Sequence, residues 1–180
     1  MYKKNDNWVA YILGFGACFL LSLIPFRPPN IEPILATLMP YSRAYGPRAG
    51  FIFAFASIFL FDLFTGEVGP WTLVTGLSYG MLGVWATYFF KRRKNSRRGY
   101  VTFAIIGTLF FDITTGFTVG PIFFGQPLST AIIGQIPFTA LHLVGNISFA
   151  LVLSPALYRY VIENKKLKTY SITSFIQKFV

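Results

Sequence analysis

Two aspartates, Asp62 and Asp112, lie in apolar surroundings within a short pattern that the sequence contains twice. Each follows a phenylalanine and begins Asp-x-x-Thr-Gly, and a Gly-Pro pair comes shortly afterwards. A carboxylate in or at the edge of a membrane span is costly, which makes ligand binding the first hypothesis. A structural role is the alternative, because such a side chain also accepts hydrogen bonds from the turn that follows it. The pairing in two repeats favours structure, and direct ligand contact stays open.

A second set of polar side chains lies in the last apolar stretch. His142, the only histidine, precedes Asn146 by one helical turn, so both occupy one helix face. Gln135 lies further toward the expected outer side. Polar side chains inside a bundle often form hydrogen bonds between helices, and ligand or proton handling is the alternative for His142. We expect no metal site, because no second ligand pattern accompanies the histidine.

A proline-rich segment over residues 26–33 carries Arg27, Asn30 and Glu32. These side chains could bind an anionic or amide-bearing ligand, or they could pair with one another and with the aspartates. Trp71 and Phe124 lie near expected membrane boundaries, where aromatic belts occur without any function. Stacking on a planar ligand is the alternative for both aromatic side chains.

The sequence shows none of the usual catalytic arrangements. It has no Ser/His/Asp set, no Cys/His pair and no glycine-rich phosphate loop followed by lysine. We therefore expect neither an enzyme nor a bound cofactor. If the protein moves a solute uphill, the energy must come from an ion gradient or from a partner.

Composition places these residues in a membrane. The chain has 180 residues, of which 54% are hydrophobic and 12% are charged, and a soluble domain of this length could not bury so much apolar surface. Six of the sixteen Lys and Arg residues lie between Lys91 and Arg98. Basic residues that flank apolar spans mark the cytoplasmic side, so the net charge of +10 does not indicate nucleic-acid binding.

We predict an all-α integral membrane protein with about six transmembrane helices, both termini inside, forming a single domain over residues 1–180. The second span is short or broken, and Pro137 is expected to divide a final apolar stretch that is too long for one crossing. A cytoplasmic tail over 162–180 is either an amphipathic helix on the lipid surface or disordered. The expected spans are 8–25, 31–44, 49–64, 71–90, 100–115 and 137–161.

The first span carries small residues at every fourth position. Such a stripe lets another helix approach closely, and that helix belongs either to this chain or to a partner membrane protein. Spacing alone leaves both alternatives open. The stripe consists of Ala10, Gly14, Cys18 and Ser22.

These features resemble the substrate-binding (S) components of energy-coupling factor (ECF) transporters, the vitamin importers of prokaryotic plasma membranes. The likeness rests on the small-residue stripe, on the segment Pro29–Pro33 before a short second helix, and on the run from Asp62 to Thr72. It implies a subunit that binds a vitamin or related micronutrient from outside and hydrolyses nothing. The implied pocket includes Asn30, Glu32, Asp62, Trp71, Asp112, Gln135 and His142.

The same resemblance implies that the first helix docks onto a transmembrane coupling subunit driven by two ATPases. Ala10, Gly14, Cys18 and Ser22 would form that docking face, with Gly14 where the family usually has a second alanine. No motif identifies the cargo. A non-transporting membrane scaffold is the alternative function, but a scaffold needs no polar residues that converge on an outer cavity.

Overall fold

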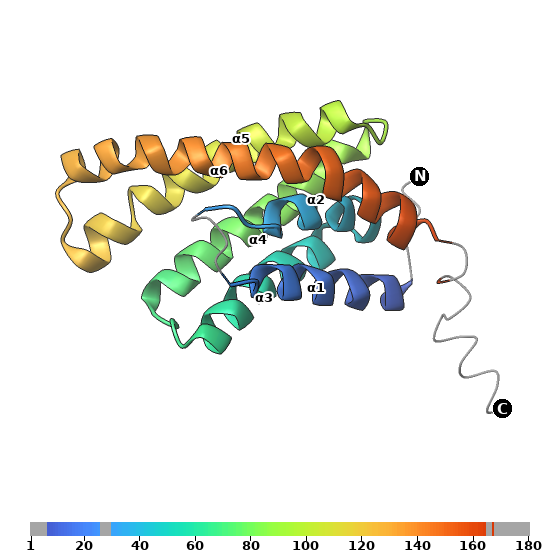
Figure 1. Cartoon of the computed structure of the whole chain (residues 1–180), viewed down its shortest axis with the longest axis horizontal. Coiled ribbons are helices and arrows are strands. Elements are labelled where there is room, and N and C mark those ends of the chain that lie inside the picture. The colour runs from blue at the N-terminus through green and yellow to red at the C-terminus, as the bar shows by residue number, and fades with distance from the viewer. Residues whose placement is uncertain (1–6, 26–29, 165–166, 168–180) are drawn as a thin grey trace.

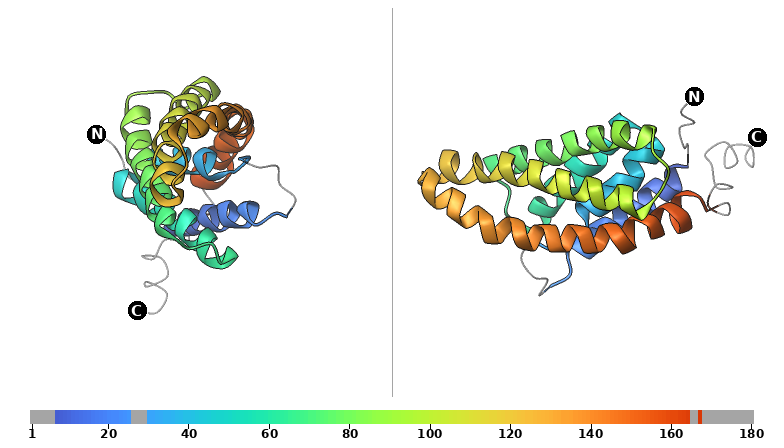
Figure 2. Two further views of the ribbon diagram at one scale, coloured as in Figure 1. Left: turned by 90° about the vertical axis from the view of Figure 1, so that its left-hand side faces the viewer. Right: turned by 90° about the horizontal axis from the view of Figure 1, so that it is seen from above.

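The computed structural model describes residues 7–25, 30–164 and 167, and they form an α-helical bundle (Figures 1 and 2). Four helical segments are long and apolar enough to cross a membrane, and α1 is a shorter apolar helix. The prediction of an all-α membrane protein is confirmed. The elements are α1 (Trp8–Ser22), α2 (Ile34–Tyr45), α3 (Pro47–Thr65), α4 (Pro70–Lys91), α5 (Arg97–Gly116), η1 (Val119–Phe123), α6 (Leu128–Leu157) and η2 (Tyr158–Ile162).

The short helix α2 forms the centre of the bundle. Every residue in it except Arg43 is buried, and it contacts α1, α3, α4, α5 and α6. Its 12 residues give a length of about 18 Å, well short of a hydrocarbon core of about 30 Å. The expectation of a short second helix is confirmed, and one half of the bundle therefore has no helix along its axis.

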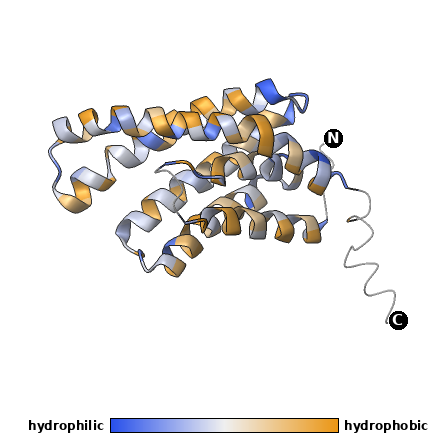
Figure 3. Cartoon of the chain, viewed as in Figure 1, coloured by the Kyte–Doolittle hydropathy of each residue, from blue (hydrophilic) through white to orange (hydrophobic). Residues whose placement is uncertain are grey.

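The start of α1, the connection between α4 and α5, and the end of η2 lie at the same end of the bundle, on the right in Figure 1. We call this the basic end, because residues 91–98 lie here; Figure 3 colours this connection as strongly hydrophilic. This arrangement agrees with the expectation that both ends of the helical region and the basic loop share one side. The turns after α1, α3 and α5 lie at the opposite end.

The expected division of the last apolar stretch at Pro137 is wrong. Helix α6 runs without interruption from Leu128 to Leu157, a length of about 45 Å, with Pro137 inside it. The proline removes one backbone hydrogen bond, but α6 packs along α5 and also contacts η1, and packing against neighbours allows proline within membrane helices. Figure 1 shows the α5–η1–α6 hairpin projecting beyond α3 and α4 at the end opposite to the basic end.

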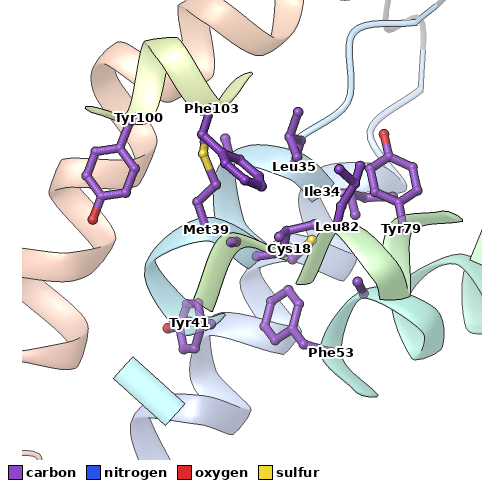
Figure 4. Close-up of a cluster of buried hydrophobic side chains, with 14 of the residues drawn as sticks. Cys18, Ile34, Leu35, Met39, Tyr41, Phe53, Tyr79, Leu82, Tyr100 and Phe103 are labelled. Atoms are coloured by element: carbon purple, nitrogen blue, oxygen red, sulfur yellow. The ribbon is translucent and has the colours of Figure 1, made fainter. Parts of the chain in front are cut away.

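The small-residue stripe of α1 packs inside this chain. The hydroxyl of Tyr41 in α2 donates a hydrogen bond to the Ala10 carbonyl at 2.9 Å, and the same ring leaves no space for a side chain at Gly14. Thr37 Oγ1 lies 3.0 Å from Cys18 Sγ, and Figure 4 shows Cys18 and Tyr41 in the core with Phe53. Ala10, Gly14, Cys18 and Ser22 are all buried.

Of the two alternatives left open for this stripe, the structure shows packing against the chain's own helices. The docking role expected for these four residues stays a prediction. The opposite face of α1 exposes Ile12, Leu13 and Leu20.

Candidate functional site

A cavity of about 530 Å³ lies at the end opposite to the basic end, in the half of the bundle that α2 does not reach. It is bounded by the ends of α3, α4, α5 and α6, by η1, and by Glu32, which precedes α2. This volume is within the usual range for small-molecule sites. The aromatic lining consists of Phe61, Trp71, Phe111 and Phe138, and the polar lining of Glu32, Asp62, Glu67, Thr75, Thr115, Gln126 and Gln135.

The cavity collects residues that are far apart in the sequence. Four of the seven predicted pocket residues line it, namely Glu32, Asp62, Trp71 and Gln135. Asp112 and His142 do not line it but lie behind its wall, because the rings of Phe111 and Phe138 both contact the His142 ring edge-on, at centroid distances of 5.7 and 5.8 Å. The structure therefore brings six of the seven residues to one region.

His142 and Asp112 form a buried pair between α6 and α5. His142 Nδ1 lies 2.7 Å from Asp112 Oδ1, and both side chains are 1% exposed. Since an ionised carboxylate only accepts hydrogen bonds, we assign a proton to Nδ1. The other nitrogen, Nε2, lies 3.5 Å from the hydroxyl of Tyr79 in α4 and 3.7 Å from Glu32 Oε1. This histidine thus joins three helices and the segment before α2.

A second polar contact lies one helical turn from this pair. Asn146 in α6 donates a hydrogen bond from Nδ2 to Thr108 Oγ1 in α5 at 2.8 Å. The two contacts form a ladder, because residues four apart share a helix face. Interhelical hydrogen bonding, the first alternative for His142, is therefore what the structure shows. Asp112 Oδ2 and Asn146 Oδ1 have no hydrogen-bond partner within the described part of the chain.

The two copies of the Phe-Asp-x-x-Thr-Gly pattern share local contacts but differ in tertiary role. In both, the threonine hydroxyl donates to the carbonyl of the phenylalanine, at 2.9 Å for Thr65 and 2.8 Å for Thr115. Asp62, however, accepts a hydrogen bond from Thr72 rather than from a histidine. Asp62 also lines the cavity, so both roles considered for it are compatible with its position.

Thr72 connects the end of α3 to the start of α4. Its Oγ1 donates to Asp62 Oδ2 at 2.6 Å and accepts from the backbone N–H of Gly69 at 3.1 Å. We expect Thr72→Val to lower the free energy of unfolding by about 1–3 kcal/mol, because it removes both bonds and leaves the carboxylate unpartnered. Thr75→Val is the control, since the Thr75 hydroxyl bonds only carbonyls of its own helix.

Both variants would be compared by denaturant titration in the same detergent. Equal stability of the Thr72 and Thr75 variants would show that the Asp62–Thr72 contact does not stabilise the α3–α4 connection.

Trp71 lies at the start of α4, at the edge of the cavity. Its indole N–H donates to the Glu67 carbonyl at 3.1 Å, and its ring lies 5.2 Å from that of Phe124. The two aromatic residues singled out for stacking therefore contact each other beside the cavity. A planar molecule in the cavity would meet the indole of Trp71 directly.

Asn30 is the one predicted pocket residue that lies neither in the lining of the cavity nor behind its wall. Its φ is +63°, a left-handed conformation that asparagine adopts more readily than most residues. Its carbonyl approaches Gly145 of α6, where a side chain would crowd Asn30 and Ile31. The backbone of Asn30 therefore lies against α6, close to Gly145. Arg27 and most of the expected tail over 162–180, namely residues 165–166 and 168–180, lie outside the described residues.

Sequence reasoning missed several lining residues, chiefly Glu67, Gln126, Phe111 and Phe138. Glu67 lies within the turn that follows the first Phe-Asp pattern. An acidic residue in that turn was the sequence feature that could have identified it as a lining residue. Phe111 precedes Asp112, and Phe138 precedes His142 by one helical turn, so their positions followed from the polar residues already identified. In the described segments, no group of three or more His, Cys, Asp or Glu side chains could hold a metal ion.

Fold and cavity together define an all-α membrane protein with a small-molecule-sized cavity at one end of its helices, an arrangement suited to a transport subunit. A family model described as "ECF-type riboflavin transporter, S component" matches residues 9–159, and the chain belongs to this family. It is therefore a membrane transport subunit and not an enzyme. Neither the curated proteins nor the solved structures gave a match.

Proposed function

We propose that this chain captures a vitamin-like molecule in the cavity at the outer face of a prokaryotic plasma membrane. Riboflavin is the first candidate, because the description of the matching family model names it. The observation that carries the proposal is the cavity of about 530 Å³, with aromatic walls and several polar groups, on the end opposite to the basic loop. Basic loops face the cytoplasm, so this cavity opens outward.

The lining suits a planar, heteroatom-rich ligand. Phe61, Trp71, Phe111 and Phe138 offer ring faces and edges, and aromatic pairs prefer offset or edge-on contacts. Glu32 offers a carboxylate whose Oε1 already lies 3.7 Å from His142 Nε2. The buried histidine therefore helps to hold this carboxylate in position for a ligand. A few fixed polar groups within apolar walls are the usual basis of ligand orientation.

Uptake requires partners in this proposal. The sequence contains no glycine-rich phosphate loop followed by lysine, so ATP hydrolysis belongs to two separate ATPase subunits. A transmembrane coupling subunit would connect these ATPases to the present chain. Because the small-residue stripe of α1 is buried, we place the contact with that subunit on the exposed apolar residues of α1, such as Ile12 and Leu13, or on a rearranged form of this helix.

The direct test is equilibrium binding of riboflavin to the purified protein in mild detergent. Flavin fluorescence and the melting temperature of the protein would be followed in parallel, together with thiamine and pyridoxine as further vitamins. A ligand at a thousandfold excess over its Kd stabilises the folded protein by about 4 kcal/mol. If no vitamin shifts the melting temperature of a well-folded sample, the proposed function is contradicted.

Trp71 provides a second test of the same cavity. We expect Trp71→Ala to weaken binding of a planar vitamin by about 10-fold, because a stacking contact is worth roughly 1 kcal/mol or more. Trp85→Ala is the matched control, since Trp85 lies elsewhere on α4 and contacts Phe103 and Phe110. Titration of ligand fluorescence gives both affinities, and equal losses in the two variants would remove Trp71 from the site.

A further inference from the structure

All charged residues in the described lining of the cavity are acidic. They are Glu32, Asp62 and Glu67, and none of the described lining residues is Lys, Arg or His. Glu32 comes from the segment before α2, Asp62 from the last turns of α3, and Glu67 from the turn after α3. The three carboxylates thus face one space from different elements.

Within the described part of the chain, few groups balance this negative charge. Asp62 has a neutral partner, Thr72. His142 is the only nearby group among the described residues that can become cationic, and it lies between Asp112 at 2.7 Å and Glu32 at 3.7 Å. Even a protonated His142 would offset only one of four carboxylates. These are the three in the cavity lining (Glu32, Asp62 and Glu67) and Asp112.

Helix dipoles do not reverse the negative electrostatic potential that the carboxylates create in the cavity. The starts of α4 and α6 lie at this end of the bundle, and a helix start attracts anions. The ends of α3 and α5 lie at the same end and carry the opposite partial charge. With two helix starts and two helix ends around the cavity, the side-chain carboxylates determine the field inside it.

We infer that the cavity selects uncharged or cationic ligands that carry N–H or O–H donors, and that it discriminates against the phosphate esters of the same ligands. A phosphate carries close to two negative charges and needs cationic or N–H partners, whereas the charged groups in this described lining are all carboxylates. Neutral donors and cations gain hydrogen bonds or charge pairs from the same carboxylates. This inference rests on the proposed function, and it assigns to Glu32, Asp62 and Glu67 a role in specificity.

The test compares riboflavin with riboflavin 5′-phosphate, which share the planar ring and differ in charge. Thiamine with thiamine phosphate and pyridoxine with pyridoxine phosphate serve as further pairs, all measured by fluorescence or thermal shift at one ionic strength. We expect each phosphate ester to bind at least about 100-fold more weakly than its parent, because it places two charges near three carboxylates. Phosphate esters that bind as tightly as their parents would overturn the inference while leaving the proposed function intact.

Charge-neutralising variants show whether the carboxylates cause the discrimination. Glu67→Gln and Asp62→Asn should each reduce the ratio of phosphate-ester Kd to parent Kd by about 3- to 10-fold, since each removes one repulsive charge. Glu163→Gln removes the same charge beyond η2, at the basic end, and should leave the ratio unchanged. A ratio that stays constant in the two cavity variants would assign the discrimination to shape and overturn the inference. If no parent vitamin binds, the proposed function fails and this inference fails with it.

Discussion

Replacing His142 by alanine is expected to lower the free energy of unfolding by about 3–5 kcal/mol, because the substitution leaves the buried Asp112 carboxylate without its partner. Both side chains are 1% exposed, and Asp112 Oδ2 has no other hydrogen-bond partner among the described residues. The variant also removes the groups that face Tyr79 and Glu32. Denaturant titration in detergent micelles, followed by tryptophan fluorescence, measures the loss.

A double-mutant cycle separates the pair from the packing of the imidazole ring. Asp112→Ala combined with His142→Ala removes both partners of the contact, and we expect its cost to be smaller than the sum of the two single costs by more than about 1 kcal/mol. Ser148→Ala is the control on the same helix, because its hydroxyl is exposed and bonds only the Val144 carbonyl. Strictly additive costs would show that Asp112 and His142 do not interact in the folded protein.

The sequence was sufficient to predict the class of fold and the shared helix face of two polar residues. Apolar spans, flanking basic residues and one short proline-containing segment predicted an all-α membrane protein with a short second helix. His142 and Asn146 were placed on one helix face by their spacing alone, and that face does meet α5. These predictions depend on composition and helical periodicity, which act within a single segment.

The remaining features depend on tertiary partners that spacing does not specify. Asp62 and Asp112 occupy equivalent positions in two copies of one pattern, yet one contacts a threonine and the other a histidine. The small-residue stripe of α1 could pack against many different helices. Only the fold shows that Tyr41 of α2 packs against it. Pro137 was expected to divide the last helix, but packing of α6 against α5 and η1 keeps it continuous.

The second large effect is expected at Gly83, where the backbones of α3 and α4 lie close together. A side chain at Gly83 would overlap the Gly50 carbonyl, and one at Gly50 would come within 2.8 Å of the Gly83 carbonyl. In each case the obstacle includes backbone, which cannot rotate away as a flexible side chain can. We expect Gly83→Ala to destabilise the protein by about 2–3 kcal/mol and Gly83→Leu by more, since overpacking forces the two helices apart. Chemical unfolding in detergent provides the measurement.

Gly16→Ala is the matched control, because Gly16 lies within α1 and a side chain there meets nothing within 4 Å. Alanine is the better helix former by roughly 1 kcal/mol, so this variant should be neutral or slightly stabilising. The contrast between the two glycines tests the packing of α3 on α4 directly. These helices also hold Asp62 and Trp71 at the cavity, so a Gly83→Leu protein that remains folded should bind its ligand more weakly. If Gly83→Leu unfolds at the same denaturant concentration as Gly16→Ala, then the close backbone contact between α3 and α4 is not part of the native fold.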